Sequence, residues 1–83
     1  MINKLREEIN LIDNEICRLF EKRMKLSLTI GKIKKGSGIP IVSPEREKEI
    51  LDRLRNNVDD WCKDYVERLY SHIFEISREC QKY

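Results

Sequence analysis

The sequence predicts an all-α chain of three helices that forms a homodimer. Apolar residues recur at alternating spacings of three and four over most of the chain, and both prolines and all but one of the glycines gather in one short segment. The length of the first predicted helix, compared with the 83 residues available, predicts the homodimer. We find no strand pattern, internal repeat or low-complexity segment. We therefore expect one domain over residues 1–83.

The first predicted helix covers about residues 2–35. Its apolar residues follow a heptad rhythm, which is typical of a helix face meant for burial. We call this set the seam: Ile2, Leu5, Ile9, Ile12, Ile16, Leu19, Leu26, Ile30 and Ile33, with Arg23 at its one cationic position. No proline interrupts it, and the single glycine, Gly31, costs a helix only about 1 kcal/mol. A seam of this length predicts one continuous helix.

A loop and a second helix follow. The stretch GSGIPIVSP predicts a loop over residues 36–43. Ser43 followed by Pro44 is typical of an N-cap with proline at the first helical position, so the second helix covers about residues 44–56. Its inward stripe contains Glu47, Leu51, Leu54 and Val58, with Ile50 beside it.

The third predicted helix covers about residues 60–81. The NNVDD stretch before it predicts a turn, with Asp59 or Asp60 as the cap. Its apolar residues again recur at helical spacing, as Cys62, Val66, Leu69, Ile73, Ile76 and Cys80.

The first helix is too long for its own chain to cover. About 34 residues at about 1.5 Å each span about 50 Å, whereas a compact globule of this size has a radius of gyration of only about 12 Å. Because the seam is apolar almost to both ends, a second chain must bury it. We expect the long helices of a homodimer to pair; the simpler alternative is an extended coiled-coil arm.

Composition argues against several functional classes. The net charge of +2 is too small to indicate a nucleic acid or a membrane as the partner. No apolar run reaches the roughly 18 residues of a membrane span, and no leader segment is evident, so we expect a cytoplasmic protein. Cys17, Cys62 and Cys80 are odd in number and form no C-x-x-C pair, which predicts reduced, mostly packed thiols.

Arg23 places a permanent positive charge at a seam position, where burial is unfavourable unless the charge is compensated. Arg23 either extends its charge out of the bundle or meets a counter-ion inside it. Arg23 and Lys34 share a helix face about 16 Å apart, and residues 22–35 contain six basic residues and no acidic one. Arg6 lies about 25 Å from Arg23 on one chain, but antiparallel pairing brings it beside the Arg23 of a second chain. These positions predict a pocket for a small, multiply charged anion, built partly across the dimer interface.

The other helices add polar residues to this pocket. Glu47 lies on an apolar stripe and should face inward, with Arg46 beside it to hold its charge. The third helix carries the stripe Tyr70, Phe74, Ser77 and Gln81, although serine and glutamine near a helix end are also typical of solvated positions. We find no plausible pair of nucleophile and base, and no set of metal ligands. We expect no cofactor.

The chain resembles a known family, the all-helical (type II) chorismate mutases, in a short monofunctional form. The similarity lies in LREEINLIDNEICRLFEKR, IGKIK, PEREKEIL and ISRECQ. Each motif alone is weak, but their order and spacing together are specific and cover nearly the whole chain. The resemblance implies an intertwined homodimer that converts chorismate to prephenate by a Claisen rearrangement, in the biosynthesis of phenylalanine and tyrosine.

The resemblance also implies a role for each site residue. Arg23 of one chain and Arg6 of the partner chain would hold the two carboxylates, with Ser77 at the carboxylate end. Lys34 would bridge a carboxylate and the ether oxygen, and Gln81 would donate to that oxygen. A fixed donor there stabilises the charge that develops in the transition state.

The remaining roles concern the ring. Glu47 would accept a hydrogen bond from the ring hydroxyl and Arg46 would orient Glu47, while Ile30 and Phe74 would press on the ring. Ser43 departs from the family pattern, since some members have an aspartate there, near the ring hydroxyl.

Three alternatives stay open at this stage. An isochorismate pyruvate lyase shares the fold and much of the cationic site, although Glu47 favours the mutase. A helical nucleic-acid-binding module could use the basic run at 22–35, but its cations would have to face outward. The third alternative is a purely structural helical dimer.

Overall fold

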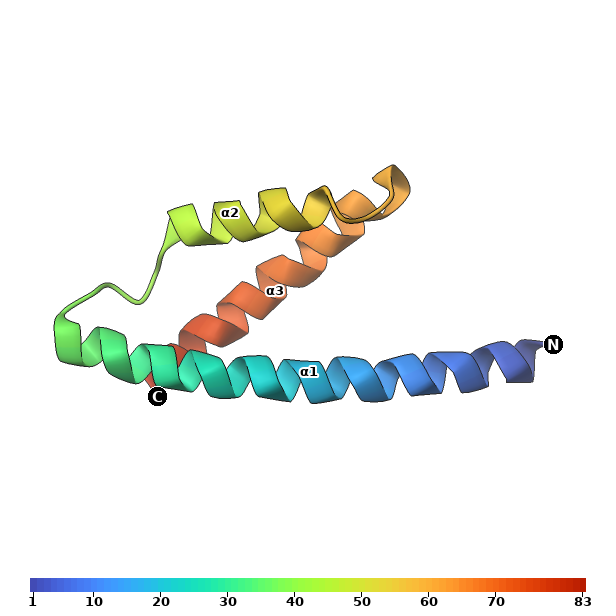
Figure 1. Ribbon diagram of the computed structural model, residues 1–83, viewed down its shortest axis with the longest axis horizontal. Helices are drawn as coiled ribbons and strands as arrows, with labels where there is room; N and C mark the ends of the chain where they lie inside the picture. The colour runs from blue at the N-terminus through green and yellow to red at the C-terminus, as the bar shows by residue number, and fades with distance from the viewer.

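The computed structural model describes residues 1–83 and contains three α-helices, one 3-10 turn and no strand (Figure 1). The helices are α1 (Ile2–Ser37), α2 (Pro44–Arg55) and α3 (Lys63–Lys82), and the turn η1 (Asp60–Cys62) joins the last two. The predicted all-α class with three helices is confirmed.

The long helix α1 ends two residues later than the sequence pattern indicates. Gly36 remains helical, and Gly38 ends the helix in the left-handed conformation with a φ of 71°. The backbone N–H groups of Gly38 and Ile39 both bond to the carbonyl of Lys34, at 3.0 Å in the case of Ile39. A glycine adopts this C-terminal geometry without the steric cost that a Cβ brings.

The start of α2 follows the expected pattern in position but not in side-chain bonding. Ser43 is the N-cap residue and Pro44 begins the helix. The carbonyl of Ser43 accepts the backbone N–H of Glu47 at 3.1 Å, whereas the Ser43 hydroxyl makes no capping bond. That hydroxyl is therefore available to other partners.

The third helix crosses α1 and also packs against α2 (Figure 1). Figure 1 shows α3 running diagonally from the η1 turn to the C-terminal half of α1, where the chain ends. The buried residues lie along these contacts and are few: Ile50, Phe74, Ser27, Ser77 and Gly31. Two of the five are serines and one is glycine, so this chain alone has a very small apolar core.

Helices α1 and α3 approach each other closely at Gly31. A Cβ at this position would lie 2.5 Å from the Cα of Gln81 and closer still to its carbonyl oxygen. Only a residue without a side chain permits this approach. Gly31 therefore sets how near the last turn of α3 can come to α1.

The seam is uncovered along its whole length. Its apolar residues keep between 45% and 63% of their surface exposed, and α1 accounts for the 54 Å length of the molecule. The radius of gyration is 15.5 Å, against about 12 Å for a compact chain of this size. Helix α3 covers a neighbouring stripe of α1, which begins at Arg23, the cationic position of the seam, and continues through Ser27, Gly31 and Lys34.

On α3, the apolar pattern only partly predicts the buried face. Phe74 and Ser77 are buried, whereas Leu69 and Ile76, both on the predicted apolar face, remain 56% and 38% exposed. The stripe that faces α1 is the one that carries Ser77 and Gln81. The small and polar side chains of this stripe allow the close packing that the larger apolar ones would prevent.

The structure also describes the cysteines and the character of the helices with respect to a membrane. All three cysteines are free thiols; Cys62 and Cys80 are half-buried, and Cys17 is exposed. None of the helices combines the length and the apolar character that crossing a membrane requires.

Candidate active site

A cavity of about 710 Å³ opens between the C-terminal half of α1, the loop after it, the start of α2 and the last turns of α3. This volume is within the range of small-molecule sites, about 300–1,000 Å³. All expected site residues except Arg6 line it: Arg23, Ile30, Lys34, Ser43, Arg46, Glu47, Phe74, Ser77 and Gln81. Residues from all three helices and the loop thus meet in one place.

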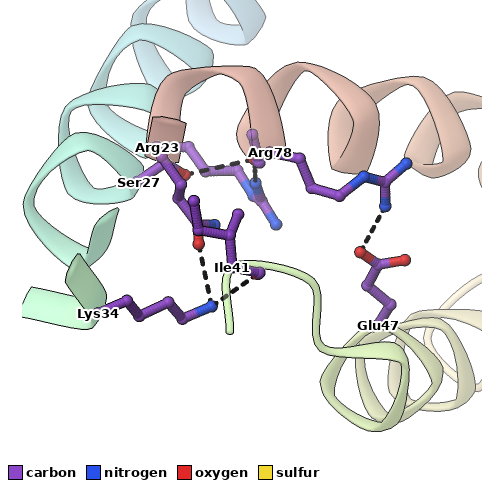
Figure 2. A network of polar contacts seen from close by, with 8 residues as sticks. Arg23, Ser27, Lys34, Ile41, Glu47 and Arg78 are labelled. Atoms are coloured by element: carbon purple, nitrogen blue, oxygen red, sulfur yellow. Dashed lines mark hydrogen bonds and ion pairs between the residues drawn. The ribbon is translucent and has the colours of Figure 1, made fainter. Parts of the chain in front are cut away.

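Arg23 is held inside the cavity by α3. Its Nη1 donates to the Ser77 hydroxyl at 2.6 Å (Figure 2). Its guanidinium lies 5.9 Å from the centre of the Tyr70 ring. The Ser27 hydroxyl is 3.3 Å from the same Ser77 oxygen and is itself buried. Arg23 is therefore half-buried and fixed in direction, as expected for a binding residue rather than a charge that extends into solvent.

Lys34 joins three elements at the other end of the cavity. Its Nζ donates to the carbonyl of Ile41 in the loop and to Oε1 of Gln81, each at 2.9 Å (Figure 2). An ammonium group has three protons, so one remains for a ligand. Because the Gln81 oxygen accepts from Lys34, its amide nitrogen is left to donate elsewhere. The pair thus presents two kinds of donor side by side.

Glu47 has a different partner from the one expected. Nη1 of Arg78 lies 2.6 Å from Oε2 of Glu47 (Figure 2), whereas Arg46 pairs with Glu49 at 2.7 Å. The expected contact between Arg46 and Glu47 is absent, because adjacent residues on a helix point about 100° apart while residues three apart are neighbours. Arg46 lines the cavity but does not hold the Glu47 carboxylate.

The sequence reasoning missed Arg78 as a site residue. Arg78 lies four residues after Phe74 and three before Gln81, so helical spacing already put it on the edge of the site stripe. The loop carbonyl of Ile41 was also missed, and no sequence signal identifies a backbone acceptor of this kind.

The charges around the cavity are unevenly paired. Four cationic side chains line it, and two of them, Arg46 and Arg78, are neutralised by glutamates. Arg23 and Lys34 form no ion pair with any residue of the chain. Half-buried cations without counter-ions are unfavourable unless an anion joins them. Glu45 also lines the cavity, where it is exposed and forms no ion pair. The two half-buried cations favour a negatively charged ligand.

The remaining expected residues shape the apolar part of the cavity. Phe74 is buried and packs edge to face with Tyr70 at 5.8 Å between ring centres. Ile30 faces the cavity from α1, and the half-buried Ser43 borders it at the start of α2. Histidine and cysteine are not among the lining residues. The site offers fixed hydrogen-bond donors rather than an acid–base pair.

Arg6 is the one expected residue that does not reach this cavity. It is exposed near the N-terminal end of α1, about 25 Å along the helix from Arg23. Within one chain, Arg6 therefore contributes nothing to this cavity.

The comparisons with known proteins agree with these observations. Residues 5–82 match the family model described as chorismate mutase type II. A chorismate mutase of Methanocaldococcus jannaschii is 41% identical over 87 residues, which cover 99% of this chain and 84% of that protein.

Bifunctional relatives are also similar. The bifunctional chorismate mutase/prephenate dehydratase of Aquifex aeolicus is 41% identical over 95% of this chain, and the one from Escherichia coli K12 is 32% identical over 88%. The chain spans only 22% and 19% of the length of these two proteins. No solved structure matches the chain at the significance that these relatives reach. The motif order, the three-helix architecture and the match over residues 5–82 establish that the chain belongs to the type II chorismate mutase family.

Proposed function

We propose that this chain is a chorismate mutase, which rearranges chorismate to prephenate in the synthesis of phenylalanine and tyrosine. The observation that carries the proposal is the pair of cations without counter-ions, Arg23 and Lys34, that face one small-molecule cavity. Chorismate carries two carboxylates, so it supplies the charge that the cavity lacks. The reaction is intramolecular and needs no nucleophile, which fits a lining of fixed donors.

Catalysis takes place at the Lys34–Gln81 end of the cavity. As the C–O bond breaks, negative charge grows on the ether oxygen, and donors directed at this oxygen bind the transition state more strongly than the substrate. The free proton of Lys34 and the amide nitrogen of Gln81 are such donors, because their mutual hydrogen bond of 2.9 Å orients both groups before the substrate arrives. One donor of this kind is typically worth about 3–4 kcal/mol.

The rest of the cavity selects the reactive shape of the substrate. Glu47 accepts the hydrogen bond of the ring hydroxyl, with Ser43 beside it at the start of α2. Ile30 and Phe74 press on the ring and favour the compact conformer, while Arg23 and Ser77 hold a carboxylate. Restricting the substrate to a near-attack geometry lowers the barrier further.

The active form is an intertwined homodimer in which the partner chain supplies Arg6. The exposed seam supports this, because its spacing is symmetric about residue 14: an antiparallel copy places Leu5 opposite residue 23, Ile9 opposite residue 19 and Ile12 opposite residue 16. In that register Arg6 of one chain lies within about one residue, or 1.5 Å along the axis, of Arg23 of the other. The same pairing brings the partner's Arg6 to the Arg23 end of each cavity.

The free thiols fit the reducing cytoplasm in which we expect the enzyme to work.

Loss of chorismate absorbance in the presence of the purified protein tests the proposal, with phenylpyruvate after acid treatment as the product check. Turnover of chorismate is expected. Release of pyruvate from isochorismate, without turnover of chorismate, would instead indicate a lyase. No turnover of either compound, together with salt-sensitive retention of nucleic acid, would favour a binding module.

A further inference from the structure

We propose that Arg78 is a positioning residue for the reaction: it aims the Glu47 carboxylate at the ring hydroxyl and neutralises its charge. The inference rests on the proposed function, since it concerns the residue that receives that hydroxyl. Arg78 lies on α3 and Glu47 on α2, and their side chains meet at the cavity wall (Figure 2).

The Arg78–Glu47 contact is the most enclosed ion pair of the chain. Its two side chains are 31% and 27% exposed, whereas every other ion pair has at least one partner that is 47% exposed or more. Charge–charge attraction strengthens as water is excluded, so this pair is held more firmly than the surface pairs. The pair also fixes the start of α2 against α3, at the level of the cavity.

The contact leaves the carboxylate available for a ligand. Arg78 bonds only Oε2 of Glu47, and Oε1 has no hydrogen-bond partner in the chain. A carboxylate accepts several hydrogen bonds through its two oxygens. Arg78 therefore orients the group while Oε1 stays free to accept the ring hydroxyl.

The positive charge of Arg78 is as important as its hydrogen bond to Glu47. Glu47 shares the cavity with the cations that would bind the two carboxylates of chorismate. Without a counter-ion, the Glu47 carboxylate would repel the two carboxylates of that substrate, and Arg78 removes this repulsion. Orientation should influence kcat, and neutralisation should influence KM.

Three substitutions separate the two effects. Arg78→Met removes both the charge and the hydrogen bond, and we expect kcat/KM for chorismate to fall about tenfold. Arg78→Gln retains a donor without the charge, so its loss should appear mainly in KM. Arg78→Lys retains the charge without the guanidinium geometry, so its loss should appear mainly in kcat. Arg68→Met is the matched control and should leave both constants unchanged, because Arg68 is an exposed arginine of the same helix with no ion pair.

A double-substitution cycle tests whether Arg78 acts through Glu47. In the Glu47→Gln background, Arg78→Met should change kcat/KM less than twofold, because the carboxylate it serves is gone. Circular dichroism and the mass in solution verify that each variant retains its fold; if Arg78→Met does not fold, Arg78→Gln takes its place in the cycle.

A loss in the Glu47→Gln background as large as in the unaltered protein would overturn the inference, since Arg78 would then bind the substrate directly. Unchanged kinetics in Arg78→Met, while the unaltered protein turns over chorismate, would also overturn it and leave the proposed function intact. Absence of turnover by the unaltered protein would instead refute the proposed function and the inference together.

Discussion

The two faces of α1 differ in a way that hydrophobicity alone does not anticipate. The apolar seam runs the length of the helix and stays at least 45% exposed, while the neighbouring stripe of Arg23, Ser27, Gly31 and Lys34 lies under α3. Helix α3 therefore covers the small and polar stripe of α1, and the apolar stripe of α1 remains exposed to solvent.

The difference shows that the two faces serve different contacts. Small residues on the covered stripe allow two helices to approach closely, and this approach brings Lys34 to Gln81 and Arg23 to Ser77. The seam has no partner within the chain, and an exposed apolar face of this length is typical of a protein–protein interface. The covered face thus supplies most of the α1 residues of the site, and the apolar face is the one that the proposed homodimer would bury.

The largest effect is expected from a charge on the seam. Ile12 is 57% exposed, so Ile12→Glu should change the stability of an isolated chain by no more than about 0.5 kcal/mol. In the proposed homodimer it buries a carboxylate near the twofold axis, and we expect dissociation together with loss of at least about 1,000-fold in activity. Sedimentation equilibrium and chorismate turnover measure the two effects.

The control for this experiment lies on the opposite side of the helix. Asn10 is exposed and about 200° around the helix from Ile12, so Asn10→Glu should leave mass and activity unchanged. A fully active dimer of Ile12→Glu would show that the seam is not the interface.

On the covered face, Lys34→Ala should have the next largest effect. It removes the proposed donor at the developing charge and releases both Gln81 and the Ile41 carbonyl, so kcat should fall about 100- to 1,000-fold. Ser77→Ala removes an acceptor of Arg23 at the carboxylate end and should cost about tenfold or less. Steady-state kinetics on both variants separate the roles, and equal small losses would contradict the ether-oxygen assignment.

The Gln81→Glu variant should make activity depend on acid pH. Only a protonated carboxyl donates a hydrogen bond to the ether oxygen, and the ordinary pKa of glutamate is about 4.3. The adjacent Lys34 ammonium stabilises the ionised form, which lowers the pKa of the introduced carboxyl and moves the active range further into acid. We expect about a 100-fold loss at neutral pH that shrinks as the pH falls. A flat pH–rate profile would exclude donation from this position.

The smallest effect concerns the close approach of the two helices. Gly31→Ala introduces a methyl group against the Gln81 backbone, which should cost about 1–3 kcal/mol of stability and lower activity about tenfold by separating Lys34 from Gln81. Gly36→Ala is its matched control, since a Cβ there meets nothing within 4 Å; it should stabilise the chain by about 0.4–1 kcal/mol. Urea unfolding at one protein concentration compares them, and equal stabilities would show that the contact at Gly31 is not tight.

Much of the site could be predicted because its residues lie on helices of known period. Arg23 with Lys34, and Phe74 with Ser77 and Gln81, share faces by spacing alone, and all of them line the cavity. The partner of Glu47 could not be predicted in this way. Arg46 was the neighbour in sequence, but Arg78 on another helix is the neighbour in space. The position of the Ile41 carbonyl depends on a loop, whose course no periodic pattern describes.

The amino-acid order alone was sufficient for the all-helical class, the long first helix, the seam and the unusual cations within it, because helical period and turn residues act over a few neighbouring positions. Only the tertiary structure decided which stripe of α1 is covered, how closely α3 approaches at Gly31, and that Arg78 holds Glu47. These features depend on how whole helices are placed against one another, and that placement is governed by the sizes and charges of residues far apart in the chain.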